Sequence, residues 1–288
     1  MAHEKVIWGI PHSGDRIGDL HVHSKWEKGL VKTDGKTPPW LRVEQALDKV
    51  HDFLALLDHD NIGPSIEAHE YAYVHGYNKD IEVLLGCAEI SCVEESERGR
   101  RRDGHILAYG ITDNIPFNLP ASEVVRAIHR MRGYAVAAHP LCRYAHGVGE
   151  KTFLEIATSE DPEINWDGTE GYNGIVRDWK LPLWLYEFKN PNSKMIKLYD
   201  RKKDDSQYRF GILTGGSDDH NGDVGRVLTL IPEGMTVFDA FRERARTAIV
   251  FTGGRGDYSW ASIKVQKEAG KLLVAARSLT GSLQVFPN

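Results

Sequence analysis

The chain of 288 residues lacks a long apolar run: no stretch approaches the roughly 20 residues that a membrane-spanning helix needs. Its first twenty residues contain Glu4, Lys5, Asp15 and Arg16 and have no apolar core of signal-peptide length. We therefore expect a cytoplasmic protein that is neither exported nor anchored to a membrane.

The chain also has few cysteines and no excess of positive charge. Cys87, Cys92 and Cys142 are an odd number without zinc-finger spacing, which argues against a disulfide framework and favours a reducing compartment. The formal net charge is −5, which argues against an extended nucleic-acid surface, although a small metal-lined mouth can still accept a phosphate. The sequence leaves the oligomeric state open.

Short apolar runs alternate with amphipathic windows along the chain. The strand-like runs are 53–57, 81–85, 106–109, 134–138, 183–186 and 210–214. Helices are predicted by apolar residues at helical spacing over 39–51, 64–77 and 120–132. The pattern predicts repeated βα units in an α/β domain, with terminal strands near 263–265, 272–274 and 283–285 that close or cap it.

Residues that bind metals recur where apolar runs stop. Those that follow a run are His59, Glu89, His139, Glu187, Asp218 and His220, and His21 and His23 lie in an Asp-Leu-His-Val-His-Ser segment. Imidazole suits divalent transition metals and a carboxylate can bridge two of them, so this mixture is typical of a hydrolytic cluster. Parallel barrels gather their active sites at the carboxyl ends of strands. His105 is the exception, because it precedes its apolar run.

In this order, the motifs resemble those of the PHP (polymerase and histidinol phosphatase) family. They are Asp-Leu-His-Val-His-Ser at 19–24, Asp-His-Asp at 58–60, Ala-Glu-Ile-Ser at 88–91, His-Ile-Leu-Ala-Tyr-Gly at 105–110, Ala-His-Pro at 138–140 and Gly-Ser-Asp-Asp-His at 216–220. The resemblance implies a distorted (β/α)7 TIM-like barrel over residues 1–250, with residues 251–288 as a C-terminal β extension packed on the same domain.

The resemblance also implies two or three divalent ions (Mn, Zn or Fe) and a metal-activated water that attacks a phosphoester. By motif position, the ligand sets would be His21, His23, Glu89 and Asp218 for one ion, Glu89, His105 and His139 for a second, and Asp34, His59 and His220 for a third. Glu89 and Asp218 would be the bridging or activating carboxylates. The acids that could orient the ligand histidines are Asp19, Asp58, Asp60 and Asp219.

Other positions depart from the family pattern or lie near it. Asp34 follows a longer segment, Lys25 through Lys32, than the family usually has, and Glu187 resembles the family's Glu-Val-x-Asn strand. Arg143 and Arg226 are candidates to bind substrate oxygen because they closely follow ligand motifs. Residues 141–180 are interpreted as a long excursion that covers the site.

These observations favour a metal-dependent phosphoesterase that acts on a small phosphorylated molecule. Only 34 positions separate His105 from His139, too few for the helical insertion of PHP enzymes that act on nucleoside phosphates. One alternative is hydrolysis of a carboxyl or carbamate ester, because a metal cluster alone does not choose phosphorus over carbon. Another is a non-catalytic, metal-stabilised binding module, although such a module would be expected to have lost some ligands.

Overall fold

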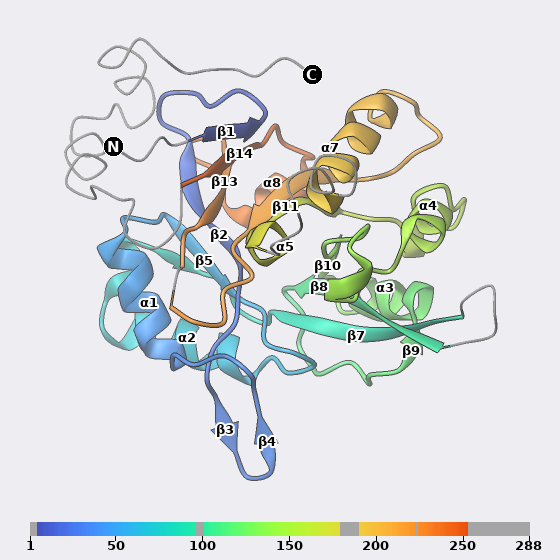
Figure 1. Ribbon diagram of the computed structural model, residues 1–288. Coiled ribbons are helices and arrows are strands. Elements are labelled where there is room, and N and C mark those ends of the chain that lie inside the picture. Colours follow the sequence, from blue (N-terminus) through green and yellow to red (C-terminus); the bar gives the residue numbers. More distant parts are fainter. Residues whose placement is uncertain (1–4, 96–100, 179–189, 223, 253–288) are drawn as a thin grey trace.

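The frame of the protein is two six-stranded sheets and a separate hairpin, seen in a computed structural model that describes residues 5–95, 101–178, 190–222 and 224–252 (Figure 1). In spatial order, the first sheet contains β1 (Lys5–Trp8), β14 (Ala248–Phe251), β13 (Val227–Ile231), β2 (Arg16–Val22), β5 (Phe53–Leu56) and β6 (Glu82–Val83). The second contains β12 (Ile212–Gly216), β11 (Gly168–Asn173), β10 (Tyr134–Ala137), β8 (Arg101–Tyr109), β7 (Ala88–Glu95) and β9 (Leu119–Pro120).

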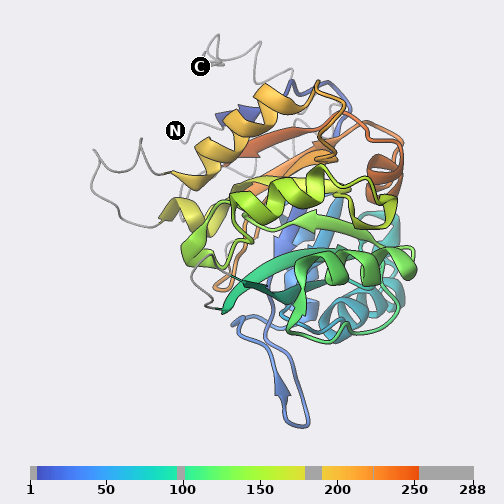
Figure 2. The ribbon, with the colours of Figure 1, turned by 90° about the vertical axis from the view of Figure 1, so that its right-hand side faces the viewer.

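Helices pack against the sheets through their apolar faces. Their bounds are α1 (Pro39–Asp48), α2 (Gly63–Val74), α3 (Ala121–Arg130), α4 (Glu150–Ala157), α5 (Gly174–Asp178), α7 (Pro191–Lys202) and α8 (Val237–Arg242). Helices α1 and α2 pack on β5 of the first sheet, whereas α3 and α7 pack on the second (Figures 1 and 2). In α3, Val124, Val125 and Ile128 are fully buried, as their helical spacing predicts. No helix in the described part of the chain is long and apolar enough to cross a membrane.

The two sheets meet where the ligand motifs lie. Single parallel bridges pair Val22 with Asp219 and His59 with Glu89, and the His23 amide donates to the Asp219 carbonyl at 3.0 Å. The fold is therefore mixed α/β with parallel pairs such as β2 with β5 and β11 with β12. The predicted distorted (β/α)7 barrel is not confirmed, because the described strands form two sheets that are joined by isolated bridges.

The position of His105 follows from an antiparallel strand. Strand β8 begins at Arg101, earlier than the predicted 106–109, and pairs antiparallel with both β7 and β10. This return places His105 opposite Ser91, two residues from Glu89. A histidine that precedes its apolar run therefore reaches the same place as those that follow theirs, which a uniformly parallel βα pattern does not predict.

The sequence suggested that residues 141–180 form an excursion over the site, but the described part of this segment contains regular elements of the fold. These elements are α4, the buried strand β11 and α5, and the fully buried Trp166 indole donates to the Phe153 carbonyl at 3.0 Å. The run 183–186, Glu187 and the predicted terminal strands lie outside the described residues.

The segment between His23 and Asp34 forms a hairpin that projects from the body (Figures 1 and 2). Its strands are β3 (Glu27–Lys28) and β4 (Val31–Lys32). At its base the Gly35 amide donates to the Ser24 carbonyl at 3.1 Å, and a Cβ at Gly35 would lie 2.5 Å from that carbonyl oxygen. This close approach lets the longer segment leave the body and return with Asp34 beside the ligand histidines.

Candidate metal centre

The nine predicted ligands converge at the junction of the two sheets. Three groups have ligand atoms within 4.8 Å of one another: His21, His23, Glu89 and Asp218; His59, Glu89 and His105; and His23, Asp34, His59 and His220. The first group has the composition that the motifs predict. In the second, His59 stands where His139 was expected, and the third contains His23 as well as the three predicted residues.

Glu89 lies at the centre and its two oxygens face different imidazoles. Oε1 lies 3.0 Å from His105 Nδ1 and 3.0 Å from His139 Nε2. Oε2 lies 3.2 Å from His23 Nε2 and 3.4 Å from His21 Nε2. His139 therefore approaches the same oxygen as His105, although it is outside the tight second group. A carboxylate whose oxygens face separate sets of nitrogens has the geometry of a bridging ligand.

The donor atoms of the first group lie close enough together to share a proton or a cation. The Nε2 atoms of His21 and His23 face each other at 3.2 Å, and Asp218 Oδ1 lies 3.2 Å from His23 Nε2. Two nitrogens that are each 2.0–2.1 Å from one ion lie about 2.9–3.4 Å apart in octahedral or tetrahedral geometry. The observed separations are those of a coordination shell, so the residues fit a divalent ion.

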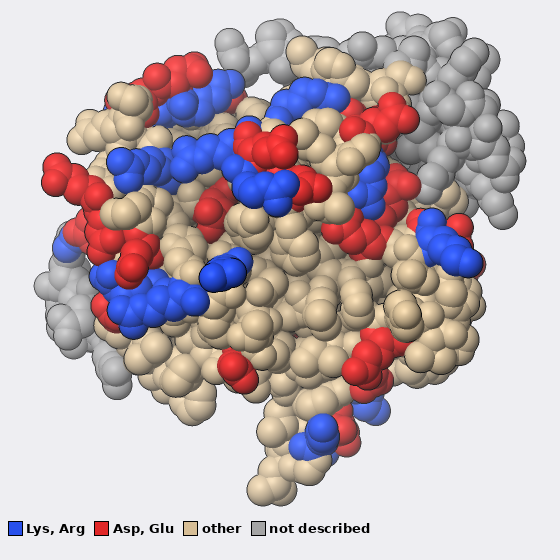
Figure 3. Space-filling model, turned by 180° about the vertical axis from the view of Figure 1, so that it is seen from behind, with Lys and Arg blue, Asp and Glu red and all other residues tan. Residues whose placement is uncertain are grey.

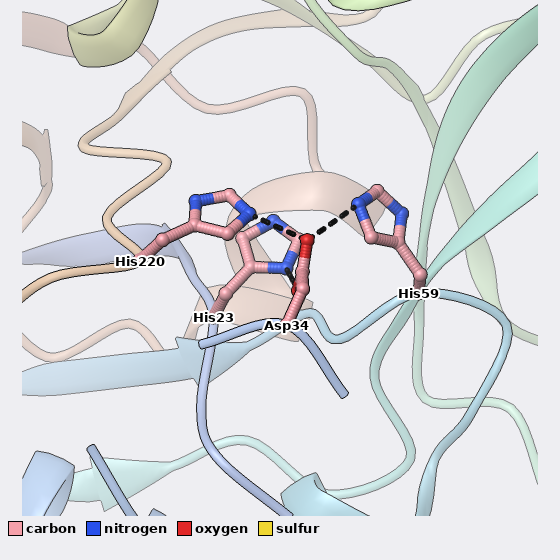
Figure 4. A group of neighbouring side chains, drawn as sticks. All are labelled: His23, Asp34, His59 and His220. Atoms are coloured by element: carbon pink, nitrogen blue, oxygen red, sulfur yellow. Dashed lines mark hydrogen bonds and ion pairs between the residues drawn. The ribbon is translucent and has the colours of Figure 1, made fainter. Parts of the chain in front are cut away.

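The third group surrounds Asp34 (Figure 4). Asp34 Oδ2 lies 3.1 Å from His220 Nε2 and 3.6 Å from His59 Nε2, and Oδ1 lies 3.6 Å from His23 Nδ1. A neutral imidazole offers one lone pair, so His23 can serve the first group through Nε2 or this group through Nδ1. Asp34 is 49% exposed, whereas the side chains of the first group are buried. The third group is therefore the open side of the centre.

Backbone strain coincides with two of the candidate ligands. His139 has φ +29° and Asp218 has φ +51°, values that side chains other than glycine seldom adopt. The Asp218 amide donates to the His21 carbonyl and its Oδ2 accepts from Asn173 Nδ2 at 3.0 Å, which helps to hold this conformation. Strained residues of this kind cluster at functional sites.

The charges of the centre are mutually dependent. Burial lowers the pKa of His21, but Asp218, Glu170 and Glu89 together raise it well above its usual value. Burial raises the pKa of Glu89, yet the facing histidines hold it well below its usual range. His59 differs, because burial and the neighbouring His23 and His105 lower its pKa to about 4. A buried acidic cluster of this kind needs positive charge, which protons or metal ions can supply.

Glu170 is the residue of the centre that the sequence did not reveal. It is buried in β11, and its Oε1 lies 2.9 Å from His21 Nδ1. Its Oε2 accepts from the His139 amide at 2.8 Å and from Asn173 Nδ2 at 3.1 Å. Accepting a hydrogen bond from Nδ1–H keeps the ring proton on Nδ1 and leaves the lone pair of His21 on Nε2, which faces the ligand group. The sequence feature that could have identified Glu170 is the Glu-x-x-Asn spacing at 170–173. The same spacing occurs at Glu187 and Asn190, the segment that resembles the family's strand.

The four acids predicted to orient ligand rings have other partners. Asp19 accepts from the amides of Ser217 and Gly225, and burial raises its pKa to about 6. Asp58 accepts from the amide and hydroxyl of Ser24, Asp60 from those of Ser91, and Asp219 pairs with Arg42. The prediction for these four is wrong in its detail, since they fix ligand-bearing loops through backbone and hydroxyl groups.

The predicted substrate residues are placed less fully. The Arg226 amide donates to Ser217 Oγ at 2.8 Å, next to the candidate ligand Asp218. The side chain of Arg143 lies outside the described part of the structure. Binding of substrate by either arginine stays a prediction.

No family model matches the chain. An uncharacterized protein from Methanocaldococcus jannaschii is 26% identical over 166 residues, which are 56% of this chain and 83% of that protein.

Similar solved structures include a candidate metal-dependent phosphoesterase from Bifidobacterium adolescentis, with 19% identity over 70% of this chain and 87% of that chain and a TM-score of 0.47. An amidohydrolase from Chromobacterium violaceum, solved with sulfate and no metal, has 17% identity over 78% of this chain and 95% of its own, with a TM-score of 0.49. Endonuclease Q, in complex with a duplex that has an abasic lesion at the active site, has 15% identity over 80% of this chain and 56% of its own, with a TM-score of 0.46.

Proposed function

We propose that this chain, whose ordered motifs resemble those of the PHP family of metal-dependent hydrolases, is a phosphoesterase that hydrolyses a small phosphorylated molecule. The observation that carries the proposal is the position of Glu89, whose two oxygens face separate sets of imidazole nitrogens at 3.0–3.4 Å. A structural metal site has a closed set of ligands around one ion, whereas a shared carboxylate is the arrangement of a polynuclear hydrolytic centre.

The side chains of the centre have distinct roles in this proposal. Divalent ions (Mn, Zn or Fe) held there would supply Lewis acidity and lower the pKa of water toward about 7. Glu89 bridges the first and second groups, and Asp218 completes the first. Glu170 holds His21 in the tautomer that presents Nε2. Because Asp34 is half exposed, a phosphate approaches from the side of the third group.

The proposed substrate is small, and the proposed location is cytoplasmic. On the face shown in Figure 3, basic and acidic side chains are interspersed and do not form a continuous basic surface. The net charge of −5 likewise disfavours a long polyanion. Arg226 and Arg143 are the proposed contacts to substrate oxygen, and the three cysteines are buried and form no disulfide, as suits a reducing compartment.

Metal analysis tests the centre. We expect at least two equivalents of Mn²⁺ or Zn²⁺ per chain, and His21→Ala or Asp218→Ala should weaken binding by more than the roughly 10–100-fold of an outer-shell change. His75→Ala is the matched control, since this exposed histidine ends α2 away from the ligands. Unchanged metal content in both ligand variants would refute the assigned ligands.

Paired substrates test the reaction. With Mn²⁺ added, the protein should hydrolyse an aryl phosphate faster than an aryl carboxylate ester, and Glu89→Gln should abolish this activity. Activity on the carboxylate ester alone would favour the alternative of carboxyl or carbamate ester hydrolysis. Stoichiometric metal binding with no turnover of either substrate class or of a panel of phosphorylated metabolites would favour the metal-stabilised binding module.

A further inference from the structure

Helix α1 buries a guanidinium group directly behind the metal centre. Arg42 is fully buried, although its side chain is charged. In sequence it lies between the apolar residues Leu41 and Val43. Its Nε donates to the His23 carbonyl at 2.9 Å, and its Nη1 donates to Asp219 Oδ2 at 2.6 Å. Its Nη2 donates to the Asp219 carbonyl at 3.1 Å. A buried charge is retained at a cost unless it is paired and hydrogen-bonded, and Arg42 meets both conditions.

These contacts join two ligand-bearing segments from different sheets. His23 follows β2 of the first sheet, and Asp219 and His220 follow β12 of the second. The rings of His23 and His220 stack with centroids 4.0 Å apart and an interplanar angle of 17°. Figure 4 shows both rings beside Asp34. Arg42 therefore fixes the backbone on both sides of the seam at which the third ligand group is assembled.

Asp219 extends this support into the loop that follows. Its Oδ1 accepts from the Asn221 amide at 3.0 Å and its Oδ2 from the Gly222 amide at 2.7 Å. The turn that presents His220 is thus built around a carboxylate whose charge is balanced by Arg42. Without the guanidinium, a mostly buried carboxylate would have to be hydrated or protonated, and the turn would lose its anchor to His23.

The first ligand group shares His23 with the third, but its members His21 and Asp218 have separate supports. Asp218 accepts from Asn173, its amide donates to the His21 carbonyl, and His21 contacts Glu170. None of these contacts involves Arg42. Loss of the guanidinium should therefore affect the third group more than the first.

We propose that Arg42 is a positioning residue for the third ligand group, and that it sets the affinity of His220, Asp34 and His59 for a divalent ion by fixing the His23 and Asp219 segments. The inference rests on the metal centre of the proposed function and is independent of the reaction catalysed.

Titration of the metal-free protein with Mn²⁺ tests the proposal, with stoichiometry and affinity from calorimetry and the spin coupling of bound ions from electron paramagnetic resonance. Wild type should bind three equivalents. Arg42→Met should bind two with near-unchanged affinity and the third about 10–100-fold more weakly, the usual effect of losing an outer-shell partner. Arg42→Lys, which keeps the charge and loses the fork, should fall between them.

Arg16→Met is the matched control. Arg16 donates to Glu82 Oε2 at 2.8 Å and to the Asp52 carbonyl at 2.9 Å, at the start of β2, far along the strand from His23. The Arg16→Met protein should be less stable than wild type but should bind three equivalents of Mn²⁺ with wild-type affinity. If Arg42→Met does not fold, Asp219→Asn tests the same pair, because it removes the charge while its one side-chain oxygen can still accept from the Gly222 amide and Arg42, at the cost of the acceptor for the Asn221 amide.

Three outcomes overturn the inference. One is a folded Arg42→Met protein that binds the third ion as wild type does. Another is equal weakening at all three sites, which would make Arg42 a general support of the fold. A wild-type protein with only two equivalents would remove the third site, while leaving a two-metal phosphoesterase intact.

Discussion

Replacing Glu170 with glutamine should impair the metal centre without removing any ligand. The Oε2 atom of Glu170 accepts from two donors, the His139 amide at 2.8 Å and Asn173 Nδ2 at 3.1 Å. An amide nitrogen at that position would meet both donors, so the glutamine oxygen should take the place of Oε2. The glutamine NH₂ group must then face His21 Nδ1, which Glu170 contacts at 2.9 Å.

The consequence is a change of tautomer at His21. To accept a hydrogen bond from the glutamine NH₂ group, Nδ1 must be unprotonated, and the ring proton moves to Nε2, the atom that faces Glu89 and His23. A protonated Nε2 cannot ligate an ion. We expect metal affinity at the first group to fall by about 10–100-fold, which corresponds to about 1.4–2.8 kcal/mol.

Two measurements check this prediction. Competition with a chelator gives the affinity for Zn²⁺, and nitrogen chemical shifts of His21 report the tautomer in the metal-free protein at a pH where the ring is neutral. Glu70→Gln, an exposed acid on α2, serves as the control. Wild-type affinity in Glu170→Gln, or a His21 proton that stays on Nδ1, would refute the reasoning.

Three further predictions concern other parts of the molecule. Burial lowers the pKa of His129, but its 2.8 Å contact with Asp167 raises it above the ordinary value. The pair therefore stabilises the fold below about pH 6.5 and loses this effect as the pH rises through the folded pKa, so His129→Gln should lower the free energy of unfolding more near pH 5.5 than near pH 9; equal losses in urea titrations would contradict this. Gly35→Ala should cost about 1–3 kcal/mol and weaken the third metal, because its Cβ would overlap the Ser24 backbone; calorimetry that finds neither effect would exclude the close approach. Burial raises the pKa of Cys87 to about 12, so an aromatic disulfide reagent should modify this thiol only after unfolding, and rapid reaction of the native protein would show that it is accessible.

Local sequence patterns predicted the elements that are strongly periodic. The apolar spacing of 120–132 corresponds to α3 at Ala121–Arg130, and the run 53–57 corresponds to β5 at Phe53–Leu56. The candidate ligands taken from the motif order do converge in the structure, including Asp34, although the long segment Lys25 through Lys32 precedes it. The hairpin explains this convergence, since a segment that closes on itself leaves its two ends in place.

Strand β11 was missed because its residues do not look like a buried strand. Gly168 through Asn173 is fully buried but reads Gly-Thr-Glu-Gly-Tyr-Asn, without an apolar run. Its polar side chains are satisfied across the sheet and by the metal centre, as in the contacts of Glu170 and Asn173. Polar residues can be buried in this strand because their partners come from segments distant in sequence. A local sequence pattern contains no information about such partners.

Arg42 and the antiparallel direction of β8 were hidden for a related reason. Helical periodicity treats a charged residue as exposed, whereas Arg42 is buried because Asp219, 177 positions away, pairs with it. Strand direction depends on which strands pair, and an apolar run such as 106–109 is the same in either direction.

Anomalous diffraction from crystals grown with Zn²⁺ or Mn²⁺ tests the central claim most directly. The account predicts peaks at the junction of the two sheets, each about 2.0–2.2 Å from its ligand atoms, with Glu89 shared between two of them and His21 and His23 bound through Nε2. Peaks confined to the protein surface, or a single ion that does not contact Glu89, would contradict it.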